Sequence, residues 1–148
     1  MQIVKIIFNI GEYSFSPNRV IWSRMSNDMR AAVSTISPSS KEEKSPIATD
    51  TTSFVSAESE IEAHYICALL NSTPIREFIK SFSSAGRGFG APSVLSHVSL
   101  SKFDDKNKIH VKLAELSIAA HNLTSVNDIK NAEKLEKEID EIVYSLFS

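Results

Sequence analysis

The stretch that most constrains the fold of this 148-residue chain runs from residue 60 to residue 82. Its apolar residues recur every three or four positions in two successive runs, which is the period of helices that each bury one face. Ser59 and Glu62 have the spacing of a capping box at the start of the first run. Asn71 suits a left-handed end for that helix, and Thr73, followed by a proline, suits the start of the next. The sequence therefore predicts two helices joined by a tight Asn-Ser-Thr turn, around which the rest of the chain packs.

The sixty residues before this stretch favour β-structure. Short runs rich in β-branched and aromatic residues, separated by turn signals, predict strands. These runs are residues 3–10, 19–22, 29–36 and 47–55. After the helix pair, residues 97–100 alternate in the same way, and we expect this segment to return to the same sheet.

Two more helices are predicted after residue 104. Apolar residues three or four positions apart indicate one helix from Ile109, and Ser125 with Asp128 suits the start of a long last helix. The predicted class is α+β, with a strand-rich N-terminal part that forms a small twisted sheet, a central helix pair and C-terminal helices. We expect an α/β domain at residues 1–104 and a helical hairpin at 105–148, packed on that domain or on a partner.

Composition restricts the classes of function. The net charge of −2 gives no bulk positive field that would attract nucleic acid. A single cysteine, Cys67, excludes an intramolecular disulfide and suits a reducing compartment. The apolar runs are far shorter than the roughly 20 residues that cross a bilayer. We therefore expect a cytoplasmic protein with no membrane partner.

Catalytic and metal-binding patterns are weak. Cys67 lies three residues after His64 on the first helix, so a thiolate–imidazole pair is conceivable. A small thiol among apolar neighbours is, however, typical of a packed core. The other histidines do not cluster with carboxylates at metal-ligand spacing. The sequence predicts no catalytic residue and no metal site.

The segment Gly86-Arg87-Gly88-Phe89-Gly90 has two open interpretations. It lacks the Gly-Lys-Ser/Thr ending of a P-loop and follows a helix, so it does not match a nucleotide-binding loop. It is either a plain surface loop or a loop that follows a nucleic-acid groove. In the second case Arg87 would contact guanine or phosphate, Phe89 would stack, and the glycines would allow close approach.

The strand-rich part supplies further basic residues. Arg19, Arg24 and Arg30, with Trp22 among them, suit a nucleic-acid patch. Trp22 is more typical of a core residue than of a contact. Lys80 lies in the second helix of the central pair. We take Arg24, Arg30 and Lys80 as candidate phosphate contacts.

Several stretches, in this order, together resemble one protein family. They are residues 7–17 with 19–22, 62–72, 86–104, 112–121 and 138–147. The set resembles the C-terminal, TaqI-like target-recognition domain of adenine-specific DNA methyltransferases from type II restriction–modification systems. The Ala-Leu-Leu-Asn-Ser turn is also similar to that of type I specificity subunits.

The resemblance implies a mixed α/β domain whose loops reach into the major groove of double-stranded DNA. A partner catalytic domain would flip and methylate an adenine with S-adenosylmethionine. This chain has no Asn-Pro-Pro-Tyr/Phe motif and no glycine-rich strand–helix turn for the methyl donor. We therefore expect no enzyme activity and no cofactor in the chain alone. The expected partners are double-stranded DNA and a catalytic methyltransferase domain or subunit.

The candidate DNA-binding residues come from residue chemistry and not from the family motif. They are Gly86, Arg87, Gly88, Phe89, Arg24, Arg30 and Lys80. The alternative hypothesis is a protein-interaction module that docks through its last helix onto a separate methyltransferase or specificity subunit. The apolar stripe and acidic outer face of that helix motivate this alternative.

Overall fold

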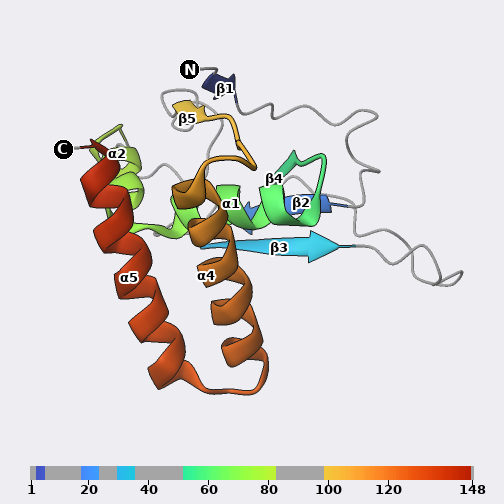
Figure 1. Ribbon diagram of the computed structural model, residues 1–148, viewed down its shortest axis with the longest axis vertical. Coiled ribbons are helices and arrows are strands. Elements are labelled where there is room, and N and C mark those ends of the chain that lie inside the picture. Colours follow the sequence, from blue (N-terminus) through green and yellow to red (C-terminus); the bar gives the residue numbers. More distant parts are fainter. Residues whose placement is uncertain (1–2, 6–17, 24–29, 36–51, 83–98, 148) are drawn as a thin grey trace, which may run out of the picture.

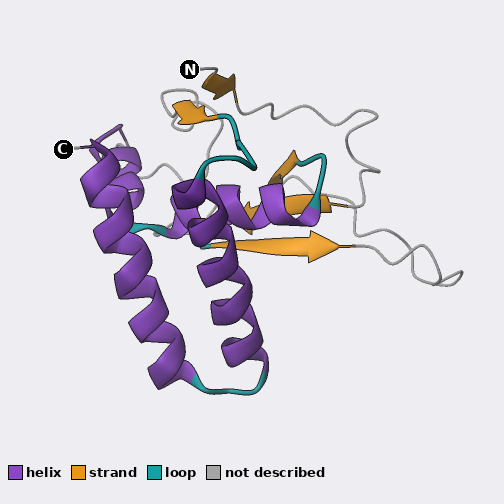
Figure 2. Cartoon of the chain, viewed as in Figure 1, coloured by secondary structure: helices purple, strands orange, loops and turns teal. Residues whose placement is uncertain are grey.

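The computed structural model shows the α+β class that the sequence predicts. The residues that the structure describes are 3–5, 18–23, 30–35, 52–82 and 99–147. A three-stranded antiparallel sheet lies against the first helix, and a long helical hairpin lies beside that helix (Figure 1). Figure 2 shows the last two helices as a long pair, whereas the first helix lies over the strands of the main sheet in this view.

The main sheet has the strand order β3-β2-β4. Its strands are β2 (Asn18–Ser23), β3 (Ala31–Thr35) and β4 (Thr52–Ser56). Val20 in the middle strand lies opposite Val33 on one side and Val55 on the other. The predicted strands at 19–22, 29–36 and 47–55 are therefore present where they are described, and residues 29, 36 and 47–51 lie outside the described residues.

A separate two-stranded sheet pairs β1 (Ile3–Lys5) with β5 (Ser99–Ser101). Ser99 and Leu100 do return to a predicted N-terminal strand, with Leu100 opposite Val4, but this pair forms a sheet of its own and does not join β2, β3 and β4. Residues 97 and 98 lie outside the described residues. Alternation predicts a strand but not its partner, because the partner is set by the tertiary fold.

The predicted helix pair is present as α1 (Glu60–Asn71) and α2 (Thr73–Phe82). Asn71 is the last helical residue of α1 and is not left-handed, because Asn127 is the only non-glycine residue with positive φ among those described. Ser72 alone separates the helices, with φ −67° and ψ 145°. Its carbonyl accepts the N–H of Arg76 at 2.9 Å, so α2 begins one residue before the predicted first turn.

The start of α1 is capped as predicted, with one difference. Ser59 Oγ accepts the N–H of Glu62 at 3.2 Å. The Glu62 carboxylate accepts the N–H of Glu58 at 2.8 Å, where an ideal capping box would use the N–H of Ser59. Both bonds give an acceptor to N–H groups near the start of the helix, where the backbone itself offers none.

The C-terminal hairpin consists of α4 (Lys108–Ser125) and α5 (Ile129–Phe147). Ser125 ends α4 and does not begin the last helix, which corrects the predicted start. Asp128 is the residue before α5, and its carbonyl accepts the N–H of Ala132 at 3.1 Å. Asn127 makes the turn with φ 61°, a left-handed conformation that asparagine tolerates well.

One core joins the sheet and the helices. It centres on Trp22 from β2, Tyr65 and Leu70 from α1, Leu113 from α4 and Val143 from α5, each at most 2 % exposed. Trp22 is therefore a core residue, as its type indicated. The apolar stripe of α5 packs inside this chain.

A carboxylate from α5 caps the start of α2. Asp140 accepts the N–H of Thr73 at 2.8 Å and the Thr73 hydroxyl at 2.6 Å. A helix start has unpaired N–H groups and a partial positive charge, so a carboxylate is favourable there. This contact joins the C-terminal half of α5 to the junction between α1 and α2.

Asp140→Ala should lower the free energy of unfolding by about 1–2 kcal/mol, the range for a lost cap and charge-assisted hydrogen bonds. Urea unfolding followed by circular dichroism measures this change. Glu141→Ala is the matched control, because Glu141 is exposed on the same helix and surface substitutions cost within about 0.5 kcal/mol. Equal losses in the two variants would contradict the capping role.

Candidate functional site at the edge of strand β3

The outer edge of β3 is closed by a side chain from α1. Among the described strands, β3 lies at the end of the main sheet and pairs only with β2, so its other side is an open strand edge. Asn71 Oδ1 accepts the N–H of Ala31 at 2.7 Å, and Asn71 Nδ2 donates to the carbonyl of Ala31 at 2.8 Å. This pair of bonds reproduces what an antiparallel strand would offer one residue. The amide thus takes the place of a strand at this position.

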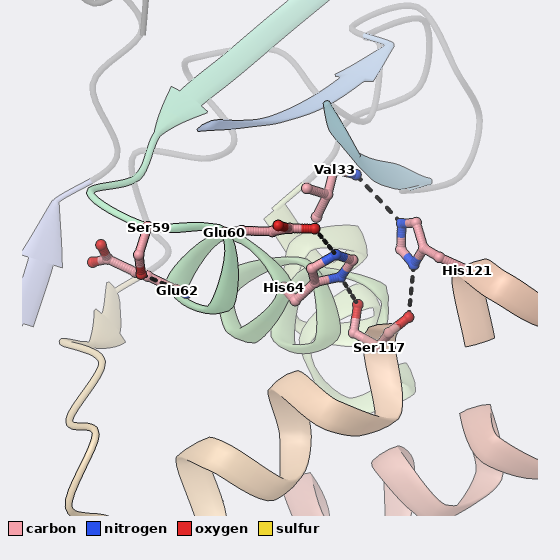
Figure 3. A network of polar contacts seen from close by, with 7 residues as sticks. All are labelled: Val33, Ser59, Glu60, Glu62, His64, Ser117 and His121. Carbon is pink, nitrogen blue, oxygen red and sulfur yellow. Dashed lines mark hydrogen bonds and ion pairs between the residues drawn. The ribbon is translucent and has the colours of Figure 1, made fainter. Parts of the chain in front are cut away.

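A histidine from α4 contacts the same edge two residues further on. His121 Nε2 accepts the N–H of Val33 at 3.4 Å, a long hydrogen bond (Figure 3). His121 Nδ1 lies 2.8 Å from the carbonyl oxygen of Ser117. Since a carbonyl can only accept, Nδ1 carries the proton and Nε2 is the acceptor. The ring therefore connects β3 to α4.

A second histidine lies beside the first. His64 Nδ1 is 2.9 Å from Ser117 Oγ, and its Nε2 is 4.0 Å from the Glu60 carboxylate (Figure 3). The rings of His64 and His121 meet edge to face with centroids 4.8 Å apart. Burial, and to a smaller extent the neighbouring His121, lower the pKa of His64 to about 4. The His64 ring is therefore a hydrogen-bonding group of the packed interior, whereas the His121 ring is partly exposed.

Cys67 is buried, as the sequence indicated, and makes no thiolate pair with His64. Its Sγ donates to the carbonyl of Ala31 at 3.4 Å and accepts from Asn71 Nδ2 at the same distance. Burial raises the pKa of the Cys67 thiol to about 12, so the thiolate is not formed near neutral pH. This thiol supports the contact between α1 and β3.

A cavity of about 390 Å³ lies next to this edge and is bounded by β3, α1, α4 and α5. Alanines form much of its wall, and the polar side chains among its lining residues mostly make bonds within the chain. Thr124 Oγ1, for example, donates to the carbonyl of Ala120 at 2.9 Å. Arg30 and Glu136 also line the cavity, and both side chains are exposed. Of the exposed lining residues, Arg30 and Glu136 are charged, whereas Ala32, Thr124 and Ser125 are not.

The predicted DNA-binding residues are placed only in part. Arg30 is exposed and directly precedes β3, and Lys80 is exposed in the last turn of α2. Arg19 and Trp22 are 1 % and 2 % exposed, so they cannot belong to an exposed basic patch. The remaining predicted residues lie outside the described residues. They are Arg24, Gly86, Arg87, Gly88 and Phe89.

The sequence did not predict the side chains that hold this site together. Asn71 was interpreted as a helix end, and His121 as one of several scattered histidines. Their partners, Ala31 and Val33, are 40 and 88 residues away along the chain. A polar residue on the inner face of a predicted helix was the available signal, because buried polar groups need hydrogen-bond partners.

Comparison of the chain with models of protein families, with curated protein sequences and with solved structures gave no match. Within the described ranges, no group of three or more His, Cys, Asp or Glu side chains is arranged to hold a metal ion. The helices of this part of the chain are also too short or too polar to cross a bilayer. The site is thus defined by its geometry, as a strand edge fixed by two helices with exposed Arg30 beside it.

Proposed function

We propose that this chain is the target-recognition part of an adenine-specific DNA methyltransferase. The catalytic domain, with its S-adenosylmethionine site, would belong to another part of the protein or to a separate subunit. The chain would select the DNA sequence in which that domain methylates an adenine. The proposal depends on the ordered stretches that resemble this family.

One structural observation carries the proposal: stretches that bear the resemblance contact one another directly. Tyr65 in stretch 62–72 donates through its hydroxyl to the carbonyl of Ser101 in stretch 86–104, at 3.0 Å. His64 of the same stretch is hydrogen-bonded to Ser117 in stretch 112–121. The resembling stretches thus pack together in one unit. This supports the interpretation that they derive together from one such domain more strongly than if they lay on separate surfaces.

The charge distribution supports an approach of DNA away from the helical hairpin. Residues 104–148 carry six lysines against nine carboxylates, which does not favour contact with phosphates. The candidate cations lie elsewhere, at Arg30 before β3 and Lys80 on α2. With a net charge of −2, the chain alone should bind DNA weakly, and the catalytic domain should supply much of the affinity.

The proposal is tested with Arg87→Ala in a methyltransferase reconstituted from this chain and the catalytic domain or subunit proposed as its partner. If Arg87 makes a bidentate contact with guanine, the variant should lose about 1–3 kcal/mol of binding free energy and relax the site preference. DNA affinity and the sequence context of methylated adenines are the measurements. Lys130→Ala, on the outer face of α5, is the charge-matched control. Unchanged affinity and unchanged site preference would remove this segment from the interface.

The alternative function is a module that docks through its last helix onto a separate subunit. Ile139 and Val143 of α5 are buried in this chain, so docking would need other residues. Tyr144 and Leu146 near the end of α5 are 48 % and 42 % exposed and favour this alternative. It predicts that Tyr144→Ser with Leu146→Ser abolishes co-purification of a methyltransferase subunit without altering site preference. Co-purification that survives both changes would count against it.

A further inference from the structure

We propose that Asn71 is a positioning residue for Arg30, which it holds at a fixed place for contact with a DNA phosphate. The inference rests on the proposed function and names residues that would serve it. Arg30 precedes Ala31, whose N–H and carbonyl both bond to the Asn71 amide, at 2.7 and 2.8 Å. The amide therefore fixes the backbone immediately beside the arginine.

The Asn71 amide is itself held firmly. Asn71 is the last residue of α1, and every residue from Ala63 to Leu70 is buried. Ser72, 1 % exposed, donates through its hydroxyl to the carbonyl of Leu69 at 2.6 Å. The next residue, Thr73, is bound by Asp140 of α5. The side chain that fixes β3 thus lies next to a junction that hydrogen bonds from Ser72 and Asp140 constrain.

A fixed backbone matters for a contact with DNA. An arginine loses side-chain freedom when it binds a phosphate, and any freedom of the backbone beneath it must be lost as well. The two hydrogen bonds from Asn71 to Ala31 restrict this backbone before DNA binds, so binding does not have to remove that freedom. Asn71 itself needs no contact with DNA for this effect.

The test separates positioning from general support of the fold. Arg30→Ala, Asn71→Ala and the double variant are compared in the reconstituted methyltransferase, by anisotropy of a fluorescent DNA duplex over a range of salt concentrations. Arg30→Ala should reduce the slope of log affinity against log salt by about one unit. Asn71→Ala should weaken binding about three- to tenfold when Arg30 is present and should have no effect when it is absent.

Two further variants keep the result interpretable. Asn71→Asp retains the acceptor for the Ala31 N–H and loses the donor to the Ala31 carbonyl. It should therefore lose less DNA affinity than Asn71→Ala, and it replaces that variant if Asn71→Ala does not fold. Ser125→Ala changes another residue that lines the same cavity and should leave DNA affinity unchanged. Its hydroxyl bonds only to the carbonyl of Asn122 in the described structure, at 2.7 Å.

Each other outcome has a distinct meaning. Equal losses from Asn71→Ala in the presence and absence of Arg30 would show that Asn71 acts through stability alone, and would overturn the inference. DNA binding and methylation that do not change in Arg30→Ala would also overturn it and leave the proposed function standing. A reconstituted complex that neither binds nor methylates DNA would overturn the proposed function, and the inference with it.

Discussion

Replacement of Trp22 by alanine is expected to lower the free energy of unfolding by about 3–5 kcal/mol, the range for loss of a large buried aromatic side chain. Trp22 is 2 % exposed and belongs to the core formed by the sheet and α1. It lies in the middle strand, opposite Ala31 on one side and Ser53 on the other. Because strands on both sides fix its backbone, the neighbouring residues cannot move in to fill the space.

The Trp22 measurement needs a suitable probe. Trp22 is the only tryptophan in the chain, so the variant loses its fluorescence signal and unfolding in urea must be followed by circular dichroism. Trp22→Phe, which keeps a ring, should cost less than the alanine variant. Val126→Ala is the control, because Val126 is 72 % exposed and its truncation should cost within about 0.5 kcal/mol. A loss below about 1 kcal/mol in Trp22→Ala would show that this side chain is not packed as described.

Acidification from pH 7 to pH 4.5 should destabilise the fold through His64. Burial holds the pKa of this histidine near 4 in the folded chain, whereas an unfolded histidine titrates near 6.5. Between these two pKa values the unfolded chain binds more protons than the folded chain. The stability that neutral His64 contributes is therefore fully present above about pH 7 and is lost as the pH falls from about 6.5 toward 4. The full shift corresponds to a loss of up to about 3 kcal/mol. The groups that face His64 are Glu60 on its own helix and Ser117 and His121 on α4.

The His64 contribution is isolated with a variant. Carboxylates and other histidines titrate in the same range, so only the difference between the wild type and His64→Gln is informative. Glutamine can bond to Ser117 and does not titrate, so the variant should lose less stability between pH 7 and pH 4.5. Thermal or urea unfolding at several pH values provides the measurement. Parallel pH profiles for the two proteins would show that His64 is not the group responsible.

Local pattern was sufficient for most of the fold. The helical period of residues 60–82 predicted α1 and α2, and Ser59 with Glu62 marked the start of α1. β-Branched and aromatic runs predicted the strands of the main sheet. Burial of Trp22 and Cys67 followed from their residue types and neighbours. Each of these properties depends on residues that are close in sequence.

Long-range contacts were not predictable in the same way. Asp140 and Thr73 are 67 residues apart, and Asn71 and Ala31 are 40 apart. Neither pair has a sequence signature, because an asparagine at a helix end and an aspartate on a charged helix each have ordinary local explanations. From the sequence, the candidate site could therefore be predicted only as a set of basic residues. The side chains that organise it, Asn71 and His121, could be identified only from the structure.

Closure of the β3 edge also bears on how copies of this chain behave toward one another. An exposed strand edge is a template onto which a strand of another molecule can add, and this is a common first step toward aggregates. Asn71 occupies both backbone groups of Ala31, and His121 occupies the N–H of Val33, without extending the sheet. Copies of the folded chain should therefore have little tendency to add strands to one another at this edge.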